Sequence, residues 1–187
     1  ALTGLPTRTL FHDRAIHALA RAHREEKLVA IMYLDLDYFK NVNDGLGHHA
    51  GDELLKAVAK RITSCLRDVD TVSRMGGDEF TVILESIPHI DNATIVAEKI
   101  LDVMQEPFHV DGHEIHVSVS IGITIYPMDD KDLTNLLKDA DQAMYRAKQA
   151  GRNNFQIFGA DMAESLAAVK LIETQIEHAL ERGELLL

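Results

Sequence analysis

The chain has 187 residues, of which 46% are hydrophobic and 26% are charged, a balance typical of one soluble globular domain with a short extension. Its 30 acidic and 19 basic residues give a net charge of -11, which argues against binding of duplex nucleic acid, because neutralising phosphates requires a positive surface. An anionic nucleotide substrate is not excluded, but it would need metal ions and a few well-placed cations.

The spacing of apolar residues and turn formers predicts helices interleaved with hairpins. In the first half of the chain we expect a helix over residues 7–26, a strand over 28–34, a helix that follows Gly47 and ends near residue 66, and strands over 70–75 and 79–84. In the second half we expect a helix over 91–105, a hairpin of strands 108–110 and 115–126, a helix over 133–150 in two pieces, and an edge strand over 154–158. This order predicts an α/β fold (an α+β sandwich) with a mostly antiparallel central sheet flanked by helices and a ferredoxin-like core.

The character of the chain changes near its end. Apolar residues at helical spacing predict an amphipathic helix there: Leu166, Val169, Ile172, Ile176 and Leu180. We expect residues 1–160 to form the domain and residues 161–187 to form a connector helix that leads to a second domain outside this sequence.

The single cysteine, Cys65, excludes a disulfide framework and fits a reducing cytoplasm. No apolar run approaches the roughly 18 residues that span a bilayer, and no signal-peptide pattern opens the chain. We therefore expect a cytoplasmic domain, excised from a longer protein that a missing region would be able to tether to a membrane.

The most informative motif is a hairpin tip with the sequence Gly76-Gly77-Asp78-Glu79. Glycines let the backbone approach a ligand closely because no Cβ intervenes, and two carboxylates follow them directly. Taken alone, the motif also fits an ordinary hairpin with solvated charges.

A second acidic cluster begins with Asp35, where the apolar strand over residues 28–34 ends. If the hairpin neighbours this strand, Asp35, Asp78 and Glu79 converge, and their mutual repulsion would raise their pKa values unless a cation lay between them. Carboxylate oxygens suit Mg²⁺ or Mn²⁺, and a metal pair would hold a triphosphate for in-line displacement. Asp35 alone would equally fit an acid at a strand-end turn.

These motifs resemble those of the GGDEF diguanylate cyclases, whose name describes the hairpin at residues 74–80. The resemblance extends over residues 1–158, with Thr7 where asparagine is more usual. The other matching segments are residues 2–8, residues 35–44 with Gly47, His48, Gly51 and Asp52, and the closing set Ala140, Asp141, Tyr145, Lys148, Gly151, Arg152 and Asn153.

The resemblance implies a nucleotidyl cyclase palm-type core and an enzyme that condenses two GTP molecules into cyclic di-GMP, releasing pyrophosphate. Two Mg²⁺ or Mn²⁺ ions per GTP would be held by Asp35, the backbone carbonyl of Leu36, Asp78 and Glu79. Asp78 would also assist deprotonation of the attacking 3′-hydroxyl, and Lys40 would support catalysis by neutralising phosphate charge.

The resemblance also assigns residues that would bind the substrate. Asn43 and Asp52 would read the guanine edge, His48 would lie near the ribose or phosphates, and Gly76 and Gly77 would admit the nucleotide. The cations Lys148 and Arg152 would neutralise phosphates. Taken one at a time, Asp52 also fits a helix cap and Lys148 also fits a favourable cation in a last helical turn.

A product-inhibition site is implied at Arg67 and Asp70, which would bind cyclic di-GMP. Taken alone, these two residues also fit a local salt bridge in a turn. The third helix offers only Lys99 where related proteins have an arginine. Residues 171–187 resemble the sequence that precedes an EAL phosphodiesterase domain, which suggests a tandem parent protein.

Because one site holds only one GTP, catalysis would require a homodimer with the two sites face to face. Three rival functions remain open: a GTP-binding module that regulates an adjacent phosphodiesterase, a cyclic di-GMP receptor, and an adenylate-type cyclase with the same core. Asn43 and Asp52 favour guanine over adenine among these.

Overall fold

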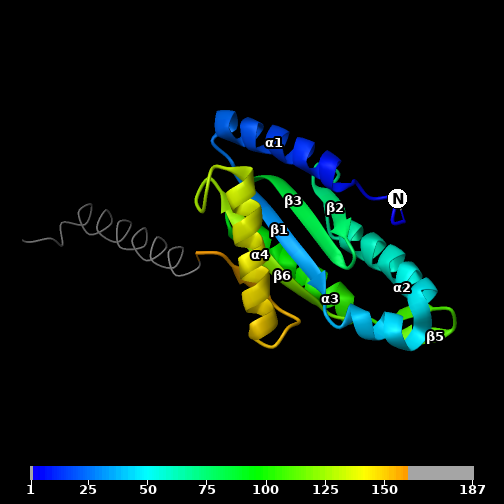
Figure 1. The fold of residues 1–187 in the computed structure, drawn as a ribbon. Coiled ribbons are helices and arrows are strands. Elements are labelled where there is room, and N and C mark those ends of the chain that lie inside the picture. Colours follow the sequence, from blue (N-terminus) through cyan, green and yellow to red (C-terminus); the bar gives the residue numbers. More distant parts are fainter. Residues whose placement is uncertain (1, 160–187) are drawn as a thin grey trace, which may run out of the picture.

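The computed structural model describes residues 2–159, and a five-stranded sheet with the strand order β2–β3–β1–β6–β7 lies at its centre (Figure 1). Its strands are β1 (Leu28–Leu36), β2 (Thr71–Gly76), β3 (Glu79–Ile87), β6 (Val119–Tyr126) and β7 (Phe155–Ile157). Only β6 and β7 pair in parallel, so the expected mostly antiparallel sheet is confirmed.

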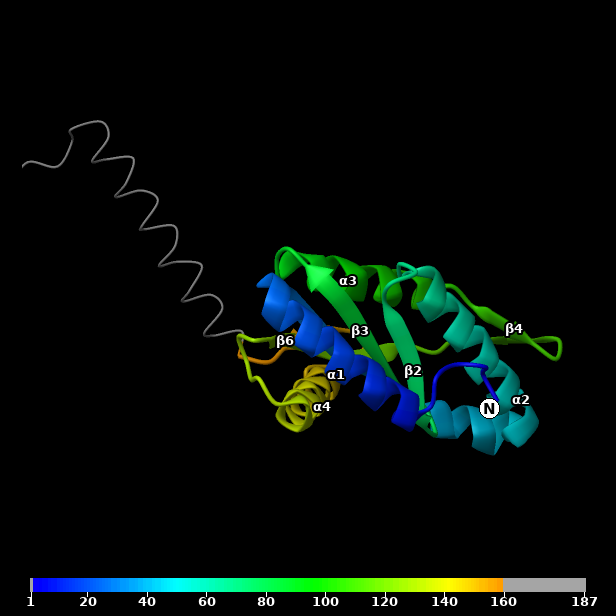
Figure 2. The ribbon, with the colours of Figure 1, turned by 90° about the horizontal axis from the view of Figure 1, so that it is seen from above.

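Helices cover both faces of this sheet (Figure 2). They are α1 (Arg8–Glu25), α2 (Phe39–Ser64), α3 (Asp91–Gln105) and α4 (Leu133–Gln149). Helices α1 and α4 pack on one face, and α2 and α3 pack on the other, so two apolar cores lie on either side of the sheet. The expected sandwich of helices around a central sheet is therefore correct.

Strand β1 lies between β3 and β6, at the middle of the sheet. Because alternate side chains of a strand point to opposite faces, Ile31 packs with α1 and α4, whereas Met32 and Leu34 pack with α2 and α3. Both faces are buried along most of β1, which explains why its sequence is apolar from Leu28 up to Asp35 near its end.

The strand expected over residues 115–126 is wrong as a single element. Its first part is β5 (His113–Ile115), which pairs only with β4 (Phe108–Val110) in a separate two-stranded sheet, whereas β6 starts at Val119 and pairs with β1. Ile115 and Val117 are both buried, so the apolar alternation continues across the break and hides it.

Two helix boundaries also differ from expectation. Helix α4 is one continuous helix rather than two pieces, because apolar residues recur every three or four positions along it and Asp132 caps its first turn. Helix α2 starts at Phe39, ahead of the expected break, and the break is a kink at Gly47 with φ 86° and ψ 163°. The kink divides α2 into two segments.

Helix α4 lies directly on β6 at Gly122, where a Cβ would overlap the backbone of Ala140 and Met144. We expect Gly122→Ala to lower the free energy of unfolding by about 3 kcal/mol, because helix backbone is unable to yield as a side chain does. Urea denaturation measures this loss. Gly45→Ala is the matched control, since nothing lies within 4 Å of a Cβ there, and equal midpoints for the two variants would contradict the expectation.

Candidate active site

The C-terminal end of β1 meets the tip of the β2–β3 hairpin. Asp35 lies opposite Glu79 in the antiparallel register, and the backbone N–H of Leu36 donates a hydrogen bond to the carbonyl of Asp78 at 3.3 Å. The structure thus places the acidic residues Asp35, Asp78 and Glu79 and the Leu36 backbone at the same edge of the sheet, as the sequence predicts.

The hairpin tip depends on its glycines and on one arginine. Gly76 has φ 154°, a conformation that only glycine adopts readily, and Gly77 has φ 52°. The guanidinium of Arg74 donates from Nε and Nη2 to the carbonyl of Gly77, at 2.9 and 2.7 Å. The sequence indicates Arg74 only as part of the motif at residues 74–80. The structure shows that Arg74 stabilises the turn that carries Asp78.

Asp35 forms an ion pair with Lys148 in the last turn of α4. Lys148 Nζ lies 2.8 Å from Asp35 Oδ1, and the two side chains are 26% and 13% exposed. Burial raises the pKa of Asp35; the hydrogen bond from Lys148 opposes this shift, and the charges of Asp78 and Glu79 add to it. The lysine that the sequence assigned to phosphate binding therefore neutralises a carboxylate here.

Glu79 has a partner that the sequence did not suggest. The hydroxyl of Tyr33 donates to Glu79 Oε2 at 3.1 Å. Tyr33 precedes Asp35 by two residues and lies on the same face of β1, and this spacing is the signal that would have identified it.

Divalent cations fit this group of residues when they arrive with a triphosphate. Within residues 2–159, no three acidic, histidine or cysteine side chains come close enough together to hold a metal on their own. Mg²⁺ seldom needs such a cage, since it is usually bound through one or two carboxylates, waters and substrate phosphates. Lys148 already places a cation against Asp35, and the donors are hard oxygens, as Mg²⁺ and Mn²⁺ prefer.

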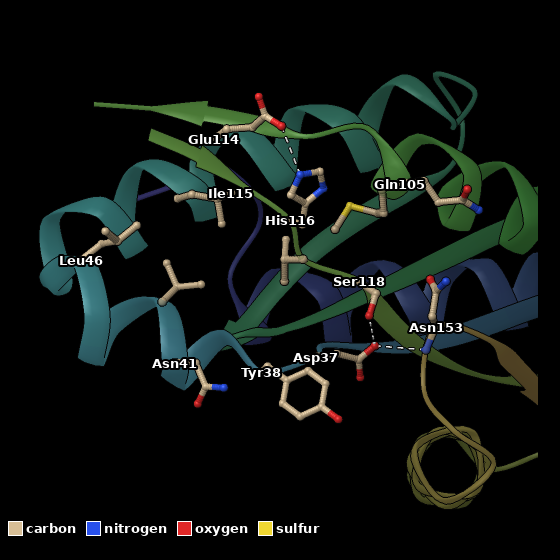
Figure 3. A pocket seen from close by; sticks show the side chains of 13 residues that line it. Asp37, Tyr38, Asn41, Leu46, Gln105, Glu114, Ile115, His116, Ser118 and Asn153 are labelled. Atoms are coloured by element: carbon tan, nitrogen blue, oxygen red, sulfur yellow. Dashed lines mark hydrogen bonds and ion pairs between the residues drawn. The ribbon is translucent and has the colours of Figure 1, made fainter. Parts of the chain in front are cut away.

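A buried carboxylate, Asp37, ties three parts of the chain together beside this group (Figure 3). It is 2% exposed and accepts hydrogen bonds from the hydroxyls of Ser118 and Ser120, at 2.6 and 2.7 Å, and from the N–H of Asn153 at 3.2 Å. The sequence gave no signal for this network, because Ser118 and Ser120 are more than 80 residues away along the chain.

Arg152 lies next to Asp37 and Tyr38. Its Nε is 3.9 Å from Asp37 Oδ1, and its guanidinium lies 4.8 Å from the centroid of the Tyr38 ring. The side chain is 40% exposed, so it keeps donors free for an anion. The structure therefore places this candidate phosphate ligand at the same end of the sheet as Asp35.

The two residues assigned to guanine recognition lie on either side of the kink in α2. A Cβ on Gly51 would overlap Oδ1 of Asn43, so the Asn43 amide lies directly against Gly51, and Asp52 follows in the chain. The side chain of Asp52 is exposed, as are those of Lys40 in the first turn of α2 and His48 just beyond the kink.

A separate cavity lies beside the buried carboxylate of Asp37. It has a volume of about 760 Å³ and borders Asp37 and Tyr38, but its other walls come from α2, α3 and the segment from β5 to Ser118 (Figure 3). None of Asp35, Asp78 or Glu79 lines it. The cavity is therefore distinct from the carboxylate group.

Arg67 and Asp70 form a local ion pair, as expected if they make a salt bridge within a turn. Arg67 Nε and Nη2 lie 3.0 and 2.7 Å from the two Asp70 oxygens, and the N–H of Glu85 also donates to Asp70. Both residues line a pocket of about 190 Å³, which Lys99 of α3 also lines. A product would have to compete with this pair for the guanidinium.

Membrane-spanning character is absent from the described part of the chain. Within residues 2–159, every helix is too short or too polar to cross a bilayer.

Comparison with known proteins agrees with this geometry. Residues 1–154 match the family described as "Diguanylate cyclase, GGDEF domain". The chain is 41% identical over 186 residues to the bifunctional diguanylate cyclase/cyclic di-GMP phosphodiesterase MucR and 38% identical over 185 residues to the cyclic di-GMP phosphodiesterase NbdA, both from Pseudomonas aeruginosa. These alignments cover 100% and 99% of this chain but only 27% and 24% of the relatives, so the chain spans about a quarter of their length.

A solved structure shows the same fold. The crystal structure of the GGDEF domain of PA1120 (YfiN or TpbB) from Pseudomonas aeruginosa superposes with a TM-score of 0.82 at 40% identity, covering 83% of this chain and 98% of that one. The central sheet, its flanking helices and the glycine hairpin beside the end of β1 are thus explained by common descent. The chain belongs to the GGDEF domain family, whose members include diguanylate cyclases.

Proposed function

We propose that this domain condenses two GTP molecules into cyclic di-GMP and releases pyrophosphate. The observation that carries the proposal is the meeting of β1 with the hairpin tip, which gathers Asp35, Asp78 and Glu79 beside Lys148. An ordinary hairpin with solvated charges has no reason to place its acids against the partly buried end of a central strand.

Asp35, Glu79, Asp78 and the carbonyl of Leu36 would hold two Mg²⁺ or Mn²⁺ ions that accompany the triphosphate. Bound there, the ions would polarise the α-phosphate and lower the pKa of the attacking 3′-hydroxyl. Asp78, at the tip of the hairpin, would accept the hydroxyl proton. Lys148 would move from Asp35 to the phosphates once the metal charge replaces its own.

Further cations and helix α2 would bind the remaining phosphate charge. Tyr38 adopts a left-handed conformation, with φ 60°, and turns the chain so that only two residues separate β1 from α2. The unpaired N–H groups of a first helical turn attract phosphate, and Lys40 lies in that turn. Arg152 would contribute from the other side of Asp37.

Asn43 and Asp52 would select guanine. A carboxylate accepts hydrogen bonds from both N1–H and the exocyclic amine of guanine, whereas adenine presents no such pair of donors. Asp52 is exposed, and the Asn43 amide lies against the preceding residue, Gly51. A preference for ATP over GTP in turnover would contradict this part of the proposal.

The reaction needs two copies of the domain, because each site holds one nucleotide and each 3′-hydroxyl must attack the other α-phosphate. We therefore expect a fusion to a parallel coiled coil, supplied with GTP and Mg²⁺, to form cyclic di-GMP far faster than the monomeric chain. Product separated by chromatography measures the rate. Without the fusion, the rate should rise more steeply than in proportion to protein concentration.

Two outcomes would contradict the cyclase proposal. One is a forced dimer that forms no cyclic di-GMP, and the other is a rate strictly proportional to concentration while the sample remains monomeric. Omission of Mg²⁺ is the matched control, and it should abolish product formation.

A second function is favoured by the relatives, which include a cyclic di-GMP phosphodiesterase and a bifunctional protein aligned along nearly the whole chain. In such a protein the domain would bind GTP and regulate an attached phosphodiesterase. Tight binding of GTP without product, even in the forced dimer, would favour this function over catalysis.

Cyclic di-GMP would inhibit the domain through Arg67 and Asp70 if the ion pair between them opens to admit the product. The pocket they line also offers Lys99, which would supply a second positive charge. Titration of the chain and of Arg67→Ala with cyclic di-GMP tests this site directly.

A further inference from the structure

Tyr33 occupies a position in β1 that looks like an ordinary place for an apolar side chain. Its neighbours Met32 and Leu34 are fully buried, whereas Tyr33 is half-buried on the face that carries Asp35. A phenylalanine would fill the same space, so the hydroxyl is the feature that needs an explanation.

That hydroxyl donates a hydrogen bond to Glu79 Oε2 at 3.1 Å. The phenolic hydroxyl of Tyr33 is the donor in this bond, since an ionised carboxylate can only accept. Asp141 of α4 and Arg8 of α1 are the other charged groups close enough to act on it.

The bond spans two strands and acts on a carboxylate that would otherwise be free to rotate. Glu79 lies opposite Asp35 in the register of β1 and β3, where two ionised carboxylates would repel each other. A neutral donor from the same sheet face limits the orientations of Glu79 without neutralising it, in contrast to Lys148, which neutralises Asp35.

We propose that Tyr33 is a positioning residue for metal binding: its hydroxyl holds the carboxylate of Glu79 across from Asp35, ready to receive a divalent cation. This inference rests on the proposed function, because it assumes that Glu79 binds the metal. Groups that orient metal-binding side chains commonly contribute a factor of 10 to 100 in metal affinity.

The test is the affinity of the whole chain for Mn²⁺ in the presence of a GTP analogue whose α,β-bridge is methylene, which prevents turnover. Electron paramagnetic resonance of free Mn²⁺ gives the bound fraction without reference to activity. We expect Tyr33→Phe to weaken Mn²⁺ binding at least about tenfold. Tyr126→Phe is the matched control, since Tyr126 pairs with Val29 at the opposite end of β1, and its affinity should equal that of the unmodified chain.

A double-mutant comparison assigns the effect to Glu79. In a Glu79→Gln background, Tyr33→Phe should cause little further loss, because the carboxylate that it orients is gone. Equal Mn²⁺ affinities of Tyr33→Phe and the unmodified chain would overturn the inference, as would an undiminished effect in the Glu79→Gln background or failure of the unmodified chain to bind Mn²⁺. The cyclase proposal fails separately, when the forced dimer binds Mn²⁺ with the nucleotide but makes no cyclic di-GMP.

Discussion

Replacing Asp35 by asparagine is expected to lower cyclic di-GMP synthesis by at least about 1000-fold while leaving the metal-free domain as stable as before, or more so. A factor of 1000 corresponds to about 4 kcal/mol of transition-state stabilisation, which is reasonable for loss of a charged metal ligand. Asparagine keeps the shape of the side chain but supplies no negative charge to the cation.

The effect on stability follows from the direction of the Asp35 pKa shift. Burial and the charges of Asp78 and Glu79 raise this pKa by more than the contact with Lys148 lowers it. Since the pKa is higher in the folded state than in the unfolded chain, ionisation of Asp35 destabilises the fold. This destabilisation develops as the pH rises from the unfolded value to the folded one and is complete above it, so Asp35→Asn removes it at neutral pH.

The rate of synthesis and the stability are both measured on the unmodified chain and on Asp35→Asn. Product formation is followed in the forced dimer, and the free energy of unfolding is obtained from urea denaturation with a chelator present. Asp13→Asn is the control, because Asp13 is exposed on α1, where it lies 3.7 Å from His17 one turn along the helix. Retained synthesis, or a clear fall in the midpoint of unfolding, would show that Asp35 is a structural acid and not a metal ligand.

The parts of the site that the sequence predicted are those encoded by local chemistry. A strand that is apolar on both faces belongs in the middle of a sheet, and a Gly-Gly pair between two strands makes a tight turn. Asp35 and the acids after Gly77 are adjacent to these features in the sequence. Their convergence then required only that the two strands pair, which they do through Asp35 and Glu79.

The parts that the sequence missed depend on contacts between distant segments. The sequence gives no sign of the contacts of Asp37, because the hydroxyls that donate to it come from Ser118 and Ser120, more than 80 residues along the chain. Tyr33 looked apolar, because only the register with β3 brings its hydroxyl to Glu79. Lys148 was assigned to a phosphate, and without one its nearest opposite charge is Asp35.

The missed boundaries have the same origin. Apolar alternation continues from β5 into β6, so nothing local marks the point where the chain leaves one sheet and joins the other. Gly45 and Gly47 both favour a break in a helix, but in α2 Gly45 lies in regular helix and only Gly47 departs from it. The connector helix expected over residues 161–187 lies outside the described residues.

Removing the carboxylate of Asp37 is expected to cause the largest loss of stability among single substitutions near the site. In Asp37→Ala, the hydroxyls of Ser118 and Ser120 and the N–H of Asn153 lose their shared acceptor inside the protein. We expect the free energy of unfolding to fall by about 3 to 5 kcal/mol, since buried donors without partners are costly and each bond to a charged acceptor is strong. Urea denaturation measures the change.

The loss should depend on the acceptor and not on the volume of the side chain. Asp37→Asn keeps one carbonyl oxygen for the Ser120 hydroxyl, which is fully buried, so we expect it to recover about half of the stability lost in Asp37→Ala. Asp102→Ala, on the exposed side of α3, should leave the midpoint unchanged. If Asp37→Ala unfolds at the same urea concentration as Asp102→Ala, the Asp37 network does not hold β1, β6 and the loop of Arg152 together. The conformation of that loop must then be set by the surrounding apolar packing alone.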